Sequence, residues 1–281
     1  MMAAMPLDRT MMYSAVVICG EKLDDADQPQ RVRNGTGFIL TMPSETVPGR
    51  LHGYVVSPDH VVAGLTNVEV EAANPFSRGQ MYPPQPVADW RRPAVHPHAD
   101  LAFAPYPLPA EQVLISLEYG TLVQYGLHVS LGAQCHYVGL LAPLGIPMAR
   151  SGTIGAVDVP GIEHDGPYEY VSHLIDVRSY DGFSGAPCYV EYPVANLKPL
   201  NPGALPVRLP HDFDERPLGT MGYFHLFCGM FTEHFSDRRM PGLASNLGTG
   251  IVLPADHILE ELMTDELRAE RAEEDKSTSA E

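Results

Sequence analysis

Three short segments of the chain each contain one residue suited to a different role in nucleophilic catalysis. His60 lies in residues 56–62, Asp100 follows a pair of small and polar residues, and Ser184 lies in a small-residue turn at 181–187. An imidazole with an unperturbed pKa of about 6.5 can take a serine proton near neutral pH. A carboxylate behind the ring stabilises the imidazolium that forms. In the chain order His, Asp, Ser, these residues predict a catalytic triad with Ser184 as the nucleophile.

The turn that contains Ser184 also offers donors for a developing oxyanion. Attack on a carbonyl group places negative charge on its oxygen, which needs hydrogen-bond donors already in position. Gly182 can adopt backbone angles that turn its N–H inward without steric cost. We therefore expect an oxyanion hole formed by the N–H groups of Gly182 and Ser184.

The elements that must position these residues are predominantly β-strands. Glycine (25 residues) and proline (27 residues) are abundant while helical periodicity is scarce, which is typical of an all-β protein with many turns. Apolar runs bounded by turns predict a first group of strands at 13–19, 36–41, 52–56, 68–72 and 101–104. A second group is predicted at 133–141, 149–157, 168–177, 188–192, 223–232 and 250–253. We expect two six-stranded antiparallel β-barrels.

These barrels divide the chain into two predicted domains and a tail. Residues 1–120 form the N-terminal barrel with His60 and Asp100, and residues 121–270 form the C-terminal barrel with Ser184. The proline-rich segments 74–97 and 193–217 are predicted surface loops. A helix is expected to follow Pro254, because Ile258 and Leu262 belong to an apolar stripe at helical spacing. The acidic residues 271–281 are expected to be disordered.

Charge and cysteine content exclude several classes of protein. Eighteen Lys+Arg against 35 Asp+Glu give a formal net charge of −17, which repels phosphate backbones and argues against a nucleic-acid partner. Four widely spaced cysteines predict reduced, buried thiols. No segment has the pattern of a membrane span or of a secretory leader. We expect a cytoplasmic protein with no membrane partner and no metal or organic cofactor.

Taken together in this order, the motifs resemble those of trypsin-like serine peptidases of the chymotrypsin fold, most closely the bacterial members without disulfides. The resemblance spans residues 13–263 and is carried by Gly35-Thr36-Gly37-Phe38-Ile39, the segment 55–62 around His60, Asp100-Leu101-Ala102, Arg150-Ser151-Gly152-Thr153-Ile154, Gly182-Phe183-Ser184-Gly185-Ala186-Pro187 and the segment 248–254. It implies a serine endopeptidase that hydrolyses peptide bonds of a protein or peptide substrate through an acyl-enzyme. It also implies a terminal helix behind the second barrel.

The resemblance further indicates a pocket for the residue that precedes the cleaved bond. Its walls are expected at Gly229, Met230, Phe231, Gly248 and Gly250, and its floor at Arg178. Arg178 in the floor would favour an acidic side chain, although the same residue also suits a surface salt bridge. Two departures from the family pattern stand out. Asp59 replaces the usual alanine before the histidine, where it either disturbs the base or points to solvent, and Phe183 replaces an aspartate that serves zymogen activation.

Three alternatives remain open at this point. His96, His98 and Asp100 have the H-x-H-x-D spacing of a metal-dependent hydrolase, and two histidines and a carboxylate can hold Zn²⁺. The segment 182–186 is close to the Gly-x-Ser-x-Gly pattern of α/β-hydrolases, with Ala186 in place of the last glycine, but the alternating helices of that fold are missing here. A catalytically inactive module that binds a peptide between the two barrels is the non-enzymatic alternative.

Overall fold

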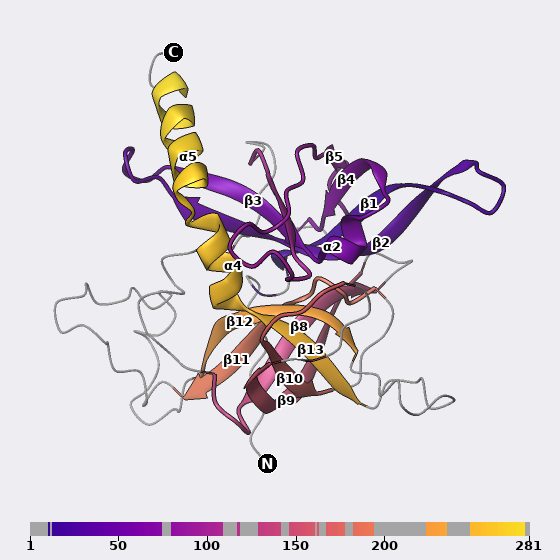
Figure 1. The fold of residues 1–281 in the computed structure, drawn as a ribbon, viewed down its shortest axis with the longest axis vertical. Helices are drawn as coiled ribbons and strands as arrows, with labels where there is room; N and C mark the ends of the chain where they lie inside the picture. Colours follow the sequence, from indigo (N-terminus) through magenta and orange to yellow (C-terminus); the bar gives the residue numbers. More distant parts are fainter. Residues whose placement is uncertain are drawn as a thin grey trace.

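The structure, a computed structural model, describes residues 11, 13–74, 80–108, 117–118, 129–141, 146–160, 162, 167–177, 182–193, 223–234 and 248–278. Its strands fall into two groups, one within residues 15–118 and the other within residues 134–254 (Figure 1). The predicted domain boundary at residue 120 falls in the undescribed segment between these groups.

The N-terminal group forms an open sheet. Its strands are β1 (Ala15–Leu23), β2 (Pro29–Pro43), β3 (Leu51–Ser57), β4 (Thr66–Ala72), β5 (Gln85–Pro86), β6 (Ala102–Pro105) and β7 (Leu117–Glu118). The hydrogen-bonded order is β5-β4-β1-β2-β3-β6, and β7 pairs with β2 in parallel. All five strands predicted for this half are present. Within the described residues, however, the sheet does not close into the six-stranded barrel expected from the sequence.

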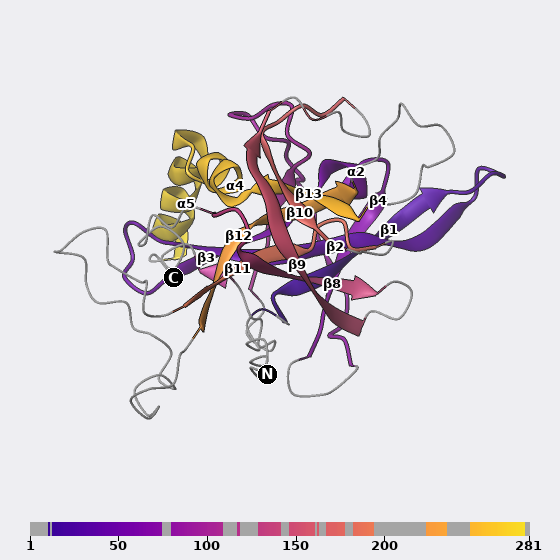
Figure 2. The same cartoon turned by 90° about the horizontal axis from the view of Figure 1, so that it is seen from below.

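The C-terminal group forms a closed barrel. Its strands are β8 (Gln134–Leu141), β9 (Ile146–Val159), β10 (Ser172–Asp176), β11 (Pro187–Pro193), β12 (Tyr223–His234) and β13 (Thr249–Pro254), in the order β10-β13-β12-β11-β8-β9. All six predicted strands are confirmed in type and place. Figure 2 shows the barrel from below, with the β1–β2 hairpin projecting away from the body of the molecule.

Alternating side chains divide the apolar interior into three cores. One core lies on the face of the N-terminal sheet that includes Ile18 and Val55, and a second fills the closed barrel around Tyr137. The third core joins the two halves, where the Phe38 ring of β2 packs 5.2 Å from the Phe227 ring of β12. The two sheets are therefore held against each other by apolar contact.

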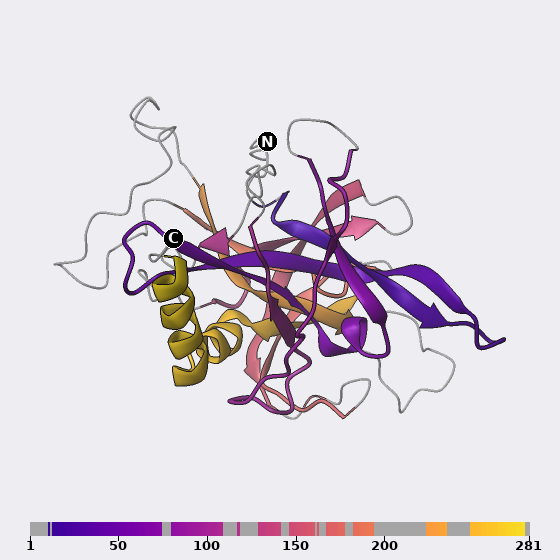
Figure 3. The ribbon, with the colours of Figure 1, turned by 90° about the horizontal axis from the view of Figure 1, so that it is seen from above.

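Two helices follow the last strand along one side of both sheets (Figures 1 and 3). The helix α4 (Ala255–Leu262) confirms the helix predicted after Pro254. The prediction of disorder from residue 271 onward is wrong for residues 271–278, because the helix α5 (Asp265–Thr278) continues to Thr278. Its charged residues find partners on the N-terminal half that the sequence pattern does not reveal.

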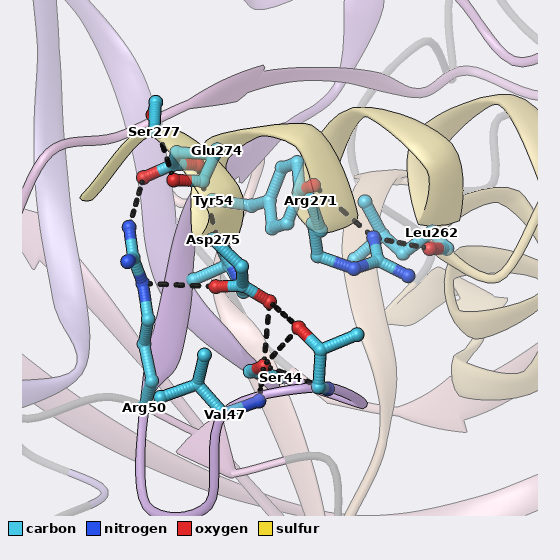
Figure 4. A network of polar contacts seen from close by, with 11 residues as sticks. Ser44, Val47, Arg50, Tyr54, Leu262, Arg271, Glu274, Asp275 and Ser277 are labelled. Carbon is cyan, nitrogen blue, oxygen red and sulfur yellow. Dashed lines mark hydrogen bonds and ion pairs between the residues drawn. The ribbon is translucent and has the colours of Figure 1, made fainter. Parts of the chain in front are cut away.

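Figure 4 shows how α5 is attached to the N-terminal sheet. The buried Asp275 carboxylate accepts hydrogen bonds of 2.6 Å from both the Ser44 and Thr46 hydroxyls and pairs with Arg50 at 3.1 Å. Arg271, also buried, donates to the Tyr54 hydroxyl at 3.1 Å and to a carbonyl at the end of α4. A buried ion requires such partners, and these contacts offset the cost of removing both charges from water.

The four cysteines, Cys19, Cys135, Cys188 and Cys228, are free and buried, as predicted. Burial raises the pKa of Cys19 and of Cys135 to about 12 and the pKa of Cys188 and Cys228 well above the ordinary value. Such thiols are poor nucleophiles near neutral pH. Among the described helices, none has the length and apolar composition required to cross a membrane.

Candidate active site

His60 and Asp100 form a hydrogen-bonded pair. His60 lies in the short helix α2 (Asp59–Val62) directly after β3, and Asp100 directly precedes the β6 region. Because β3 pairs with β6, the ends of these strands bring the two residues together. One Asp100 oxygen lies 2.6 Å from His60 Nδ1 and the other accepts the His60 backbone N–H at 3.0 Å. The carboxylate thus fixes both the ring and the backbone of the histidine.

The electrostatic surroundings of His60 favour its protonated form. Burial alone would lower the pKa of the imidazole, but the hydrogen bond and negative charge of Asp100, together with Glu233 and Asp59, outweigh burial and raise this pKa above 6.5. Asp100 is 1% exposed, whereas 37% of the His60 side chain remains accessible. The ring is therefore held from behind while its other side faces outward.

Asp59 does not point to solvent. Its carboxylate accepts hydrogen bonds of 3.1 Å from Arg92 Nε and from the Tyr168 hydroxyl. Tyr168 precedes β10 and Arg92 belongs to the proline-rich segment, so Asp59 links three parts of the chain next to the base. Its charge contributes to the raised His60 pKa, in line with the first of the two roles considered for this departure.

The loop that leads to Asp100 is held by the C-terminal helix. Glu261 of α4 is 1% exposed, and its carboxylate accepts the backbone N–H groups of Ala94 at 2.8 Å and His96 at 2.5 Å. The loop also donates from Arg91 N–H to a carbonyl of β6 at 2.8 Å. The proline-rich segment is therefore not a free surface loop throughout, because part of it packs and carries Asp100 into position.

Ser184 lies in a turn that is anchored by a buried ring. The neighbouring Phe183 is 0% exposed and lies in the core of the closed barrel, 5.5 Å from the Tyr137 ring. Gly139 of β8 gives this ring its space, since a Cβ there would meet Phe183 at 2.3 Å. Apolar burial thus holds the turn where the resemblance would place a charged aspartate.

Glycines give the turn its backbone shape. Gly182 and Gly185 have φ of +93° and +95°, in the region that side chains disfavour. A Cβ at Gly185 would lie 1.7 Å from the Thr36 carbonyl oxygen and 2.9 Å from Pro58. The turn can approach the N-terminal sheet this closely only because position 185 lacks a side chain.

Thr36 of β2 joins the turn to the N-terminal half. Its N–H donates to the Ser184 carbonyl at 2.8 Å and its hydroxyl donates to the Gly182 carbonyl at 2.6 Å. The Thr36 carbonyl in turn accepts the Ser57 hydroxyl at 3.0 Å. Ser57 ends the strand that leads to His60, so a short series of hydrogen bonds connects the turn to the histidine-bearing corner.

Two backbone donors of the turn have no internal acceptor. In the described part of the chain, neither the Gly182 nor the Ser184 N–H makes a hydrogen bond. Within the same residues, no hydrogen bond joins Ser184 to His60. Hydrogen bonds between catalytic groups are often long before substrate binds, so the two side chains can still act together.

The residues predicted to line the pocket lie next to this turn. Phe231 accepts the Gly185 N–H at 2.7 Å and donates its own N–H to Ala186 at 2.9 Å. Met230 and Phe231 are 0% and 1% exposed, so their side chains belong to the cores and only their backbones flank the turn.

The structure describes the glycines of the predicted pocket but not its predicted floor. The Phe231 ring lies over Gly250, and Gly229 faces the Leu253 carbonyl with φ of +153°. Gly248 has φ of +80° and accepts the Val177 N–H at 2.6 Å. Arg178, the predicted floor, lies outside the described residues, so its role stays a prediction.

The residues of the alternative metal site do not converge. Both Asp100 oxygens bind His60, and the His96 ring instead pairs with Glu260 at 2.7 Å and stacks on His257 at 4.0 Å. His98 contributes its backbone carbonyl to Glu169 N–H. This arrangement gives no support to a metal-dependent hydrolase at His96, His98 and Asp100.

Sequence reasoning missed several residues that hold the site. These residues act through contacts with partners that are distant in the sequence: Thr36, Arg92, Tyr168 and Glu261. Glu261 offered one usable signal, because it is a carboxylate flanked by the apolar stripe of a helix. A charged residue next to a buried helix face requires a specific partner.

Comparisons with known proteins bear on the fold. No family model matches the chain, and no curated protein matches it. The MamO protease domain from Magnetospirillum magneticum matches with a TM-score of 0.54 and 15% identity, over 91% of this chain and 98% of that chain. The HtrA-type protease AlgW, solved with a decapeptide, matches with a TM-score of 0.53 and 15% identity, over 89% of this chain and 63% of that chain.

AlgW solved with a tripeptide matches with a TM-score of 0.53 and 16% identity, over 89% of this chain. This chain covers only 59% of that AlgW chain. The agreement in fold at such low identity confirms the chymotrypsin-like fold expected from the motifs, although the first of the two expected barrels is an open sheet among the described residues. The chain has the chymotrypsin-like fold that HtrA-type proteases share.

Proposed function

We propose that this protein is a serine endopeptidase in which Ser184, His60 and Asp100 form the catalytic triad. The observation that carries the proposal is the Asp100–His60 pair at 2.6 Å, because it leaves His60 Nε2 as the ring nitrogen able to accept a proton. Nε2 has no hydrogen-bond partner among the described residues. Support comes from the Thr36 contacts, which hold the Ser184 turn against the half that contains His60.

The proposed reaction uses two steps at one carbonyl. Ser184 Oγ attacks the carbonyl carbon while His60 Nε2 takes the hydroxyl proton, and Asp100 stabilises the imidazolium. The N–H groups of Gly182 and Ser184 donate to the oxyanion. His60 then protonates the leaving amine, which gives an acyl-enzyme. Water attacks the acyl group with His60 again as base, and Ser184 is regenerated.

The substrate is proposed to be a peptide or an extended protein segment. AlgW was solved with a decapeptide and with a tripeptide, and it shares this fold. Peptide bonds contain the acyl group that the proposed donors would stabilise. Gly229, Gly248 and Gly250 remain the proposed pocket backbone, with Arg178 as its proposed floor.

Active-site labelling tests the proposal directly. A fluorophosphonate probe is expected to modify Ser184 in the full-length protein, as identified by mass spectrometry of the labelled peptide. Ser184→Ala is expected to abolish labelling and to lower peptide turnover by about four orders of magnitude. The variant should keep the thermal midpoint of the parent, because it removes one partly buried hydroxyl that holds nothing in place.

A matched control separates the nucleophile from other hydroxyls. Ser57→Ala removes a hydroxyl that binds the Thr36 carbonyl, and it is expected to retain labelling at Ser184. A thiol reagent should leave the native protein unlabelled, since burial raises the pKa of all four cysteine thiols. Absence of probe labelling together with tight peptide binding would instead identify an inactive peptide-binding module.

A further inference from the structure

A row of polar side chains crosses the outer face of the closed barrel. In the register of β8, β9, β11 and β12, His136 lies opposite Ser151 and Tyr189, and Glu191 lies opposite His225. Residues directly opposed on antiparallel strands share one face of a sheet. His136, Glu191 and His225 therefore project from three neighbouring strands to the same side, away from the apolar interior of the barrel.

The possible ligand atoms of these three residues lie close together. His136 Nε2 is 3.0 Å and His225 Nε2 is 4.0 Å from the same oxygen of Glu191, and one ligand atom from each residue lies within 4.8 Å of the others. Tetrahedral zinc with bonds of about 2.0–2.1 Å requires ligand atoms roughly 3.3 Å apart. The Glu191–His136 separation of 3.0 Å is slightly shorter than that value, and the Glu191–His225 separation of 4.0 Å would have to shorten by roughly 0.7 Å when the ion binds.

We propose that His136, Glu191 and His225 bind a Zn²⁺ ion. Two imidazole nitrogens and one carboxylate oxygen form a donor set that suits zinc and other first-row divalent metals better than Mg²⁺. The three residues leave a fourth position for water. Their side chains are 11%, 22% and 10% exposed, so the site is sheltered but can be reached from solvent.

Ser151 provides the support that a ligating histidine needs. The Ser151 hydroxyl lies 2.8 Å from His136 Nδ1. When Nε2 binds a metal, Nδ1 holds the proton, and the hydroxyl can accept it as a hydrogen bond. A contact of this kind fixes the ring and its tautomer. Ser151 is therefore a positioning residue on the Nδ1 side of the His136 ring, whereas the proposed metal binds on the Nε2 side.

The site is separate from the proposed catalytic centre. Glu191 lies four residues beyond Pro187, the first residue of β11 after the Ser184 turn, which is about 13 Å along the extended strand. Bound zinc would tie β8, β11 and β12 together beside the core that joins the two halves, where Phe227 and Tyr189 pack. Its expected effect is on stability, so the proposal does not depend on peptidase activity.

Metal binding to the full chain tests the proposal. Chelator-treated protein is titrated with Zn²⁺ against a chromogenic chelator, and one equivalent is expected to bind. Zn²⁺ in about 100-fold excess over its Kd should raise the thermal midpoint by about 5 °C. Mg²⁺ should produce no such shift. Glu191→Gln keeps the size of the side chain and is expected to weaken zinc binding more than about 100-fold, since even supporting contacts are worth about 10–100-fold.

Two further variants decide the location. Ser151→Ala should weaken binding by about tenfold. His257→Ala is the matched control, because His257 stacks on His96 beside Glu260 in a second histidine and carboxylate cluster, and it should bind zinc like the parent. Parent protein that binds no zinc, or zinc binding that survives Glu191→Gln, overturns the proposal. Circular dichroism of each variant identifies loss of fold. If His136→Ala or His225→Ala fails to fold, zinc binding by Glu191→Gln decides the outcome.

Discussion

The two halves of the molecule position their proposed catalytic groups by different means. The N-terminal sheet positions a side chain, because the buried Asp100 uses both of its oxygens to hold His60. The closed barrel positions a backbone, because Gly182 and Gly185 adopt positive φ around Ser184 while Phe183 fixes the turn in the core. A charge interaction thus orients the base, and apolar packing orients the nucleophile and its donors.

This contrast predicts different kinds of damage in each half. A change on the histidine side should affect chemistry and pH dependence while leaving the fold in place. A change in the turn should affect stability and chemistry together, because the turn is part of the contact between the two halves. The predictions below test that division, beginning with the largest effect.

Asp100→Asn should produce the largest loss of chemistry. The amide removes the negative charge and can donate to Nδ1, which favours the wrong tautomer of His60. We expect kcat to fall by about four orders of magnitude with little change in KM. Steady-state kinetics on a peptide substrate measures both constants. A loss below tenfold would contradict the role assigned to this carboxylate.

Gly185→Ala should damage stability and activity together. Its Cβ would collide with the Thr36 carbonyl, and φ of +95° is unfavourable for alanine, so we expect a loss of about 3 kcal/mol or more in the free energy of unfolding. Denaturant unfolding measures the loss. Gly155→Ala in β9 is the matched control, since its Cβ would meet only the Leu174 carbonyl at 3.7 Å. Equal stability of the two variants would remove the argument for a close approach at Gly185.

Asp59→Asn should produce the smallest effect, a shift in pH dependence. Because the pKa of His60 is raised above its ordinary value, the neutral imidazole required for attack becomes the major form at a higher pH than it would in a free histidine. Removing the Asp59 charge lowers that pKa, so the rising limb of kcat/KM should move to lower pH. A pH–rate profile of parent and variant measures the shift. A limb that does not move would indicate that Arg92 neutralises Asp59, and a limb that moves to higher pH would contradict the role assigned to the Asp59 charge.

Local sequence patterns were sufficient to predict the strands and the turn around Ser184. Alternating apolar runs located the strands of the N-terminal sheet and of the barrel, and the motif around Ser184 predicted a glycine-shaped turn that the structure contains. The open edge of the first sheet could not be predicted, because whether a sheet closes depends on pairing between strands that are distant in the sequence. The order in α5 was missed for a related reason: its composition is polar, and the partners of Asp275 are residues 44–50 at the other end of the chain.

The sequence also did not predict that residues of one half support the candidate site residues of the other half. Thr36 is unremarkable in its local context, the position of Glu261 beside an apolar stripe indicates only that it needs a partner, and only the folded chain brings them to the turn and to the Asp100 loop. Phe183 was noticed as a departure from the family pattern. The sequence indicated that Phe183 cannot replace the aspartate that serves zymogen activation, whereas the structure shows that its ring anchors the turn against Gly139.

The Glu261 contact has a consequence for when the proposed active site is completed during synthesis. This carboxylate holds the backbone at residues 94–96, yet it belongs to a helix that follows the last strand of the barrel. A nascent chain still attached to the ribosome has already exposed His60, Asp100 and Ser184 before α4 emerges. Until then, the segment leading to Asp100 lacks this contact, so the proposed hydrolysis is expected to begin only after α4 has been synthesised.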